Sequence, residues 1–185
     1  MEAQELLRRV IDGDERAWGE VVDRFAGLVW SVARSYRLSS AATDDVVQTV
    51  WLRLAEHASR IRQPERLASW LATTTRNESL RVIRGNNRLT PQASVDDYVE
   101  PTTPSIEERV GDDVTLRAVL AAFAQLGPDD QQLLRLLCAV PPLDYETISE
   151  LIGRPIGSIG PTRARCLDRL KKLLPPGLDP KAGLP

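Results

Sequence analysis

The sequence has few of the residues that usually carry catalysis or hold a metal. Its 185 residues include a single histidine, His57, and two cysteines, Cys138 and Cys166. Structural zinc sites use four closely spaced Cys or His ligands, and the sequence offers no such spacing. A serine triad would need His57 as its base, but neither a nucleophile-elbow motif nor a glycine-rich phosphate loop is present. We therefore expect no catalytic residue, no metal ion and no cofactor, and hence no enzyme.

Membrane and secretory signals are missing as well. No apolar run approaches the roughly 18 residues that cross a bilayer, and residues 1–5 are acidic where a secretory signal would be basic and then apolar. Two cysteines are too few for a disulfide framework and are expected to be reduced thiols. With 42% apolar and 27% charged residues the composition is that of a globular chain. These features predict a cytoplasmic protein without membrane insertion.

The small net charge of −2 conceals two basic segments. Residues 60–88 contain seven arginines and two glutamates, and residues 154–172 contain six basic residues and one aspartate. The stretch between them, residues 89–153, contains twelve acidic and three basic residues. Two separated basic segments favour two contacts with a polyanion such as DNA, although two solvated helix faces would give the same charge pattern.

Helical periodicity predicts four helices in the first half of the chain. A short helix over about residues 3–11 precedes a longer one, for which Asp14 is the expected N-cap. The apolar residues of the longer helix recur every three or four positions and form one stripe. A third helix is expected to begin with Thr43 as its N-cap, and a fourth to run from about residue 65 to residue 84.

A change of composition separates this half from the rest. Residues 89–110 contain three prolines, several acidic side chains and few bulky apolar ones, which is typical of an extended linker. Helical signals return over residues 111–175, and the proline-rich residues 176–185 are expected to form a disordered tail. The sequence therefore predicts an all-α fold with two small helical domains, residues 1–88 and 111–175, joined by an extended acidic linker.

The strongest local motif is a helix-turn-helix over residues 144–166. Its short first helix ends at Gly153, which permits a sharp turn, and Ser158 is expected to cap the second helix. Ile156 and Ile159 are expected to wedge between the two helices. A basic second helix after a glycine turn suits entry into the DNA major groove, where its first turns read bases. The alternative is an ordinary helical hairpin with a basic surface.

The interior of the second helix carries further expectations. Pro161 is expected at about its third position, where a missing N–H costs little. Leu167 is expected on its inner side together with Leu170, Leu173 and Leu174. Cys166 is interpreted as a small packed thiol rather than a redox switch.

Taken together, residues 10–175 resemble a bacterial sigma factor of the sigma-70 family, of the small extracytoplasmic-function (ECF) type. The first half resembles sigma region 2 through residues 44–54, DDVVQTVWLRL, and residues 69–77, SWLATTTRN. The second half resembles region 4 through residues 126–134, LGPDDQQLL, which lead into the helix-turn-helix. The resemblance implies a region 2-like bundle and a region 4-like domain. It also implies a subunit that directs RNA polymerase to promoters and leaves catalysis to the polymerase.

The resemblance implies roles for two surfaces of the first domain. In the family, the polar face of the region 2 signature helix docks on the clamp coiled coil of the polymerase β′ subunit. Here that face comprises Asp45, Gln48, Thr49, Leu52 and Arg53. The following basic helix resembles the segment that opens and reads the promoter −10 element. The candidate contacts to this DNA are Arg76, Asn77, Arg81, Arg84 and Arg88.

Region 4 of the family reads the −35 element as duplex DNA and rests on the polymerase β flap. The candidate duplex contacts are Ser158, Thr162, Arg163, Arg165 and Arg169. The linker resembles an acidic segment that family members thread through the polymerase active-site cleft, and a plain tether is the alternative. Its candidates for charge mimicry are Asp96, Asp97, Glu100, Glu107 and Glu108.

The implied partners are core RNA polymerase and promoter DNA, both duplex and melted. An anti-sigma factor, of the kind that often holds free sigma factors, is a further candidate partner. The resemblance also implies association with the nucleoid when the chain is bound to polymerase.

Two other functions stay open on the sequence. A free-standing helix-turn-helix regulator would bind duplex DNA without core polymerase, typically as a dimer on a palindrome. An adaptor without DNA binding would grip only polymerase or an anti-sigma partner, and the two basic segments disfavour it. The signature at residues 44–54 and the net acidic N-terminal half favour the sigma factor.

Overall fold

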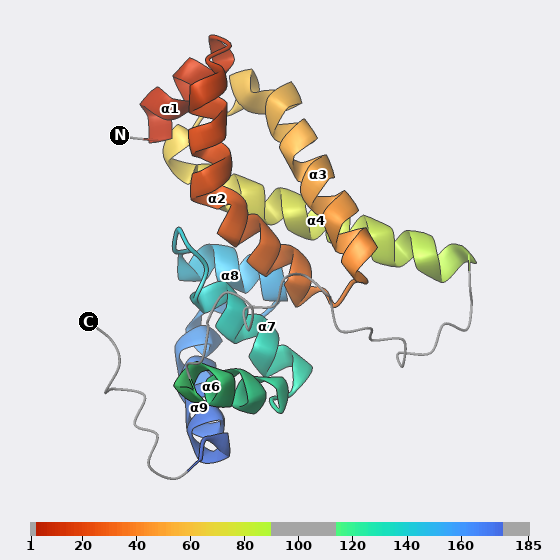
Figure 1. Cartoon of the computed structure of the whole chain (residues 1–185), viewed down its shortest axis with the longest axis vertical. Coiled ribbons are helices and arrows are strands. Elements are labelled where there is room, and N and C mark those ends of the chain that lie inside the picture. Colours follow the sequence, from red (N-terminus) through yellow and green to blue (C-terminus); the bar gives the residue numbers. More distant parts are fainter. Residues whose placement is uncertain (1–2, 90–113, 176–185) are drawn as a thin grey trace.

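The computed structural model describes residues 3–89 and 114–175, and every regular element in these ranges is a helix. The predicted all-α fold is therefore confirmed. The helices form two groups in chain order (Figure 1). The first group comprises α1 (Ala3–Ile11), α2 (Glu15–Ser35), α3 (Ser40–His57) and α4 (Leu67–Leu89), with 3-10 turns at Ala58–Arg60 and Pro64–Arg66. The second group comprises α6 (Val114–Ala124), α7 (Pro128–Leu137), α8 (Tyr145–Ile152) and α9 (Ile156–Leu173).

Two predicted segments lie largely or wholly outside the described residues. The acidic linker was predicted over residues 89–110, of which Leu89 is the last residue of α4 and the rest are not described. The predicted tail, residues 176–185, is not described either. Among the described helices, none is long and apolar enough to span a membrane.

The start of α2 follows from its N-cap. The Asp14 carboxylate accepts hydrogen bonds from the backbone N–H groups of Arg16 and Ala17, as predicted for a capping aspartate. The same carboxylate pairs with Arg9 of α1 at 2.7 Å, which ties the first two helices together. The hydrogen bond from Arg9 holds the pKa of Asp14 below its usual value. The inner side of α2 buries Val21, Leu28 and other apolar side chains.

The start of α3 differs from the expectation. The helix begins at Ser40, and the N-cap is Ser39, whose hydroxyl accepts a hydrogen bond from the backbone N–H of Ala42. Thr43 lies inside the helix, is buried, and donates its hydroxyl to the carbonyl of Ser39 at 2.9 Å. The prediction of Thr43 as the cap is therefore wrong, because an earlier hydroxyl residue can cap the helix and add one turn to it.

The start of α9 also differs from the expectation. The helix begins at Ile156 with Pro155 as its N-cap residue, and the Ser158 hydroxyl donates to the Pro155 carbonyl instead of capping. Pro161 is consequently the sixth residue of the helix rather than the third. Of the two isoleucines predicted to wedge between the helices, Ile159 is fully buried and Ile156 is 53% exposed.

The buried face of α9 includes fewer residues than the leucine pattern predicted. The buried residues are Ile159, Thr162 and Cys166, whereas Leu167 is 44% exposed. Burial of Cys166 agrees with its interpretation as a packed thiol. The thiol lies 3.1 Å from the Asp130 carboxylate, and burial, together with that carboxylate, raises its pKa to about 11. The thiol is therefore protonated at neutral pH.

The two groups of helices pack directly on each other. Helix α2 contacts α7, and helix α4 contacts α8 (Figure 1). The Tyr36 hydroxyl donates to the Leu151 carbonyl at 3.1 Å, and the Thr147 hydroxyl donates to the Ser69 hydroxyl at 3.0 Å. The buried apolar side chains of both groups form one contiguous cluster. The structure therefore holds both basic helices, α4 and α9, within a single packed unit.

Candidate nucleic-acid and polymerase surfaces

Helix α3 presents the face that the sequence predicted for polymerase docking. Its opposite side, including Val46, Val50 and Leu54, is buried in the core. On the outward side Leu52 is 65% exposed. Residues of this face are the predicted set Asp45, Gln48, Thr49, Leu52 and Arg53, all exposed or half-buried. A single exposed leucine is common on protein surfaces, so its position on the predicted face, rather than its exposure, makes Leu52 a candidate contact.

One member of the α3 face has a partner within the chain. The Arg53 guanidinium forms an ion pair with Glu78 of α4 at 3.3 Å. Glu78 also pairs with Arg81, one turn further along α4, at 3.3 Å. The α3 face and the basic helix α4 are therefore joined by the Glu78 carboxylate.

Helix α4 is long enough to carry the whole predicted basic face. It continues to Leu89, so Arg88 lies in its last turn, although the side chain of Arg88 is not described. Asn77, Arg81 and Arg84 are exposed. Arg81 and Arg84 therefore place two exposed positive charges on the described part of α4.

Arg76 lies apart from the other basic residues of α4. It lines a cavity of about 390 Å³ between the two groups of helices, together with Tyr36 and Leu151. Its Nη1 donates to Asn77 at 3.4 Å, while its Nε is buried without a hydrogen-bond partner. Burial raises the pKa of Tyr36, and the nearby Arg76 opposes that shift. Packing of the second group therefore encloses part of the predicted −10 surface.

A helix-turn-helix is present in the second group, although its second helix begins three residues earlier than predicted. Helix α8 ends before Gly153 as predicted, and the Asp144 carboxylate caps its start by accepting the backbone N–H of Thr147 at 2.7 Å. Hydrogen bonds from Thr147 hold the pKa of Asp144 below its usual value. Gly153 follows with φ = +66°, a backbone conformation that is unfavourable for residues with a Cβ atom. The turn therefore depends on this glycine.

The five residues predicted for −35 contacts do not share one face of α9. Ser158 is half-buried, and Thr162 is buried in the domain interior. Arg163 is exposed and donates from Nη1 to the Tyr145 hydroxyl at 3.3 Å. Arg165 donates to the Thr162 hydroxyl at 3.1 Å, and Arg169 donates to Asp130 at 2.5 Å. The structure thus brings Arg165 and Arg169 to one side of the helix and Arg163 to another.

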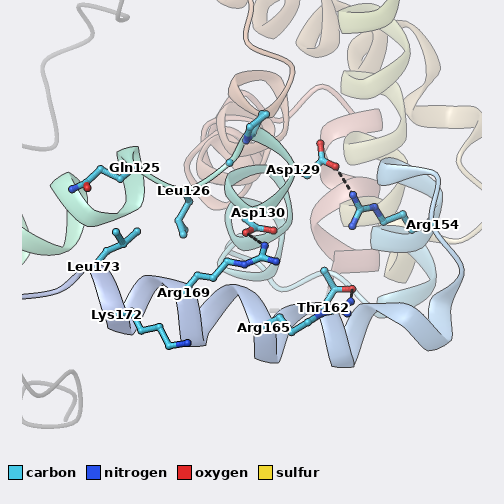
Figure 2. A pocket seen from close by; sticks show the side chains of 12 residues that line it. Gln125, Leu126, Asp129, Asp130, Arg154, Thr162, Arg165, Arg169, Lys172 and Leu173 are labelled. Atoms are coloured by element: carbon cyan, nitrogen blue, oxygen red, sulfur yellow. Dashed lines mark hydrogen bonds and ion pairs between the residues drawn. The ribbon is translucent and has the colours of Figure 1, made fainter.

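Figure 2 shows the side of α9 that carries Arg165 and Arg169. Both point into a pocket of about 870 Å³ between α9 and the turn that joins α6 to α7. Two ion pairs cross it, Arg169 with Asp130 and Arg154 with Asp129. Burial alone would raise the pKa of Asp130, but hydrogen bonds from Arg169 and Cys166 outweigh it and hold that pKa below its usual value.

Two residues of this region were not predicted from the sequence. Asp130 is buried and anchors α9 to α7 through Arg169. Nothing in the sequence pairs these two residues, which are 39 positions apart. Tyr145 is the first residue of α8 and reaches Arg163. Its position directly after the Asp144 cap is visible in the sequence and could have identified it as a surface residue of the motif.

The described residues offer no centre for metal chemistry. Within residues 3–89 and 114–175, no three His, Cys, Asp or Glu side chains gather as a metal site would require. The candidate sites in the described residues are surfaces of helices α3, α4, α8 and α9.

Comparison with known proteins shows which proteins this chain resembles. A family model described as Sigma-70 region 2 matches residues 21–89, which span α2 to α4. The chain is 29% identical over 153 residues to the ECF RNA polymerase sigma factor SigE of Mycolicibacterium smegmatis. It is 24% identical over 168 residues to the RNA polymerase sigma factor CarQ of Myxococcus xanthus. Residues 21–89 of this chain thus match region 2 of the sigma-70 family, and the chain is similar to sigma factors of the ECF group.

The coverage of these sigma factors differs. The match to SigE spans 80% of this chain but 58% of SigE, less than two thirds of that protein. The match to CarQ spans 91% of this chain and 95% of CarQ.

Two solved sigma-factor structures share the fold. The chain superposes on CnrH in complex with the cytosolic domain of CnrY with a TM-score of 0.54 and 18% identity, over 91% of this chain and 94% of the other. It superposes on the sigma factor RpoE in complex with the anti-sigma factor NepR from Bartonella quintana with a TM-score of 0.57 and 23% identity, over 78% and 88% of the two chains. The fold of this chain is therefore shared with these two proteins.

Proposed function

We propose that this chain is an RNA polymerase sigma factor that binds core polymerase and directs initiation at promoters with −10 and −35 elements. The observation that carries the proposal is the α3 face, where Leu52 is exposed on the segment that matches Sigma-70 region 2. The same chain carries a folded helix-turn-helix with a basic second helix. A free-standing regulator would have no use for the first surface.

The proposal assigns one partner to each surface. The α3 face binds the β′ clamp coiled coil of polymerase, and the exposed basic residues of α4 contact the −10 element as it is melted. Positive charge along a helix supports strand capture because it attracts the phosphate backbone. Helices α8 and α9 contact the −35 element as duplex, and the second group rests on the β flap. The chain itself carries no catalysis, which core polymerase supplies.

The proposal also divides the chain into functional parts. Residues 1–88 form the region 2-like domain and residues 111–175 the region 4-like domain, with the acidic linker of residues 89–110 between them. An anti-sigma factor is proposed as a regulatory partner, since the similar solved structure of RpoE is a complex with the anti-sigma factor NepR.

Substitution of Leu52 tests the polymerase contact. Leu52→Asp places a charge on the exposed surface without disturbing the core, so the protein is expected to stay folded. Loss of a central apolar contact should weaken core polymerase binding about tenfold or more, measured by fluorescence titration of labelled protein.

The matched control is Ile11→Asp, an exposed apolar residue at the end of α1, 49% accessible. It is expected to bind core polymerase as the wild type does. Wild-type affinity of the Leu52→Asp variant would exclude α3 as the docking face. Duplex DNA binding by the wild type without any affinity for core polymerase would instead support the free-standing regulator.

A further inference from the structure

A cavity lies where the two groups of helices meet, and the proposed contacts with polymerase and DNA leave it unexplained. Its volume is about 390 Å³. The residues that line it come from the end of α2 and from α4 in the first group, and from α7 and α8 in the second. At this junction α2 contacts α7, and α4 contacts α8. A cavity of this size falls in the range of sites that hold small molecules.

Arg76 of α4 brings an unsatisfied donor to this cavity. Its Nε is buried and has no hydrogen-bond partner among the described residues, while its Nη1 donates to Asn77 at 3.4 Å. A buried N–H without an acceptor is costly, and native proteins rarely leave one unsatisfied. A guanidinium binds carboxylate and phosphate oxygens through two neighbouring N–H groups, one of which can be Nε. Arg76 can therefore bind an oxyanion inside the cavity.

Arg37 brings a second positive charge to the lining. It follows α2 with φ = +55°, in the left-handed region that residues other than glycine seldom adopt. Such backbone strain is concentrated at ligand sites, where it serves to place a side chain. Of the described residues along the cavity, Asp129 is the acidic one, and it pairs with Arg154. The lining therefore carries more positive than negative charge.

The rest of the lining combines apolar surface with a polar group. Leu80, Leu151 and Ile152 supply the apolar surface, and Gln132 of α7 supplies a side-chain amide. Small-molecule sites typically pair apolar walls with a few polar groups that fix the orientation of the ligand. The lining therefore suits a molecule that has an oxyanion head and an apolar body.

We propose that this cavity binds a small organic oxyanion, a carboxylate or a phosphate monoester, through Arg76 and Arg37. Because the lining comes from both groups of helices, the site exists only while they are packed together. The ligand therefore favours the packed arrangement over any arrangement in which the groups separate. Binding itself does not depend on the proposed function. Its effect on initiation rests on that function, which requires α4 and α9 at two separate promoter elements.

Calorimetric titration of the full chain tests the site with four probes. Phenyl phosphate and benzoate differ in the head group, inorganic phosphate lacks the ring, and benzyl alcohol lacks the charge. The tighter of the two aromatic anions is expected to bind one to one with a Kd of about 1 mM or below, and it identifies the head group. Inorganic phosphate and benzyl alcohol are expected to bind at least about tenfold more weakly. Equal affinity for either of these two, or no binding of either aromatic anion, would overturn the proposal.

Two substitutions locate the bound probe. Arg76→Gln removes the guanidinium of the first group, and Gln132→Glu adds a negative charge on the side of the second group. Each is expected to weaken binding of the tighter aromatic anion about tenfold or more. The matched controls are Arg60→Gln, after α3, and Gln125→Glu, directly after α6, which are both exposed and outside the lining. They are expected to bind it as the wild type does. Equal losses in variants and controls would overturn the assignment to this cavity.

Initiation with core polymerase and promoter DNA tests the regulatory effect. At ten times its Kd, the aromatic anion is expected to slow promoter-dependent initiation by the wild type about threefold to tenfold, and to leave the Gln132→Glu variant unaffected. Undiminished initiation by the wild type would overturn the regulatory effect. A wild-type chain that initiates nothing without the anion would contradict the proposed function, whereas the calorimetric result decides the cavity in either case.

Discussion

At the residue scale, Asp130 illustrates how one buried carboxylate holds the second group of helices together. It lies in the first turn of α7, where the helix dipole favours a negative charge, and it accepts from Arg169 and Cys166 of α9. Its burial would be costly without these donors. The carboxylate therefore fixes the placement of α9 against α7.

Replacing Asp130 tests this role. Asp130→Asn leaves Arg169 and Cys166 without their ionised acceptor and should lower the free energy of unfolding by about 1–3 kcal/mol at neutral pH. Urea unfolding at pH 7 measures it. The control is Asp129→Asn, whose side chain is 69% exposed although it pairs with Arg154, so a loss within about 0.5 kcal/mol is expected. Equal losses in the two variants would contradict the anchoring role of Asp130.

Comparison of the wild type with Asp130→Asn also predicts a pH dependence of stability with a defined sign. The pKa of Asp130 is lower in the folded protein than its ordinary value of 3.8. Its stabilising contribution is therefore complete above the ordinary aspartate range and is lost as pH falls through the lowered pKa. The difference in unfolding free energy between wild type and Asp130→Asn should shrink as urea unfolding is repeated at decreasing acid pH. A difference that stays constant would show that ionisation of Asp130 is not the cause.

At the element scale, the helices were largely predictable because their local signals agree. Helix α8 has an aspartate cap, an apolar inner side and a terminal glycine, and it ends at Gly153 as predicted. The first residue of a helix is harder to predict where several hydroxyl residues could serve as the N-cap, as Ser39 and Thr43 could for α3. Leu167 was placed on the wrong side because leucines occur on both flanks of α9, so periodicity alone does not fix which stripe is buried.

The turn between α8 and α9 gives an element-scale prediction. Gly153→Ala should lower the free energy of unfolding by about 1–2 kcal/mol, because φ = +66° is unfavourable for a residue with a Cβ. No atom lies within 4 Å of the added Cβ, so backbone strain is the only cause. Thermal unfolding followed by circular dichroism measures the change.

Gly19→Ala is the matched control for this substitution. Gly19 lies inside α2, where an added Cβ also meets no atom within 4 Å. Alanine there should raise stability by about 0.5–1 kcal/mol, because glycine is a poor helix former. Destabilisation of both variants to the same extent would show that the added methyl group, rather than the left-handed turn, is responsible.

At the scale of the whole molecule, the packing of the two groups could not be predicted. The contact from Tyr36 to Leu151 joins residues 115 positions apart, and the one from Ser69 to Thr147 joins residues 78 apart. Helical periodicity reports only which face is apolar, not which partner covers it. The same limit explains why the position of Arg76 was not predicted. The sequence grouped Arg76 with the other −10 candidates, whereas in the structure it lines the cavity between the two groups of helices.

A reversible cross-link tests whether the packed arrangement must open. With Cys138 replaced by serine, Ser69→Cys and Thr147→Cys should form a disulfide, since the native hydroxyl oxygens lie 3.0 Å apart. Two separate promoter elements require α4 and α9 at separate places, so oxidation should lower promoter-dependent initiation about tenfold or more. Reduction of the same sample should restore it. Full initiation by the oxidised protein would show that the packed arrangement is the one that works on promoters.

The central claim is that this chain gives core polymerase its promoter choice. The most direct measurement is to mix the purified full chain with core RNA polymerase and genomic DNA, and to map the 5′ ends of the transcripts. The account predicts stable binding to core polymerase and start sites that share two upstream sequence elements, with none of these starts when the chain is omitted. Start sites that are the same with and without the chain, or duplex DNA binding that needs no polymerase, would contradict it.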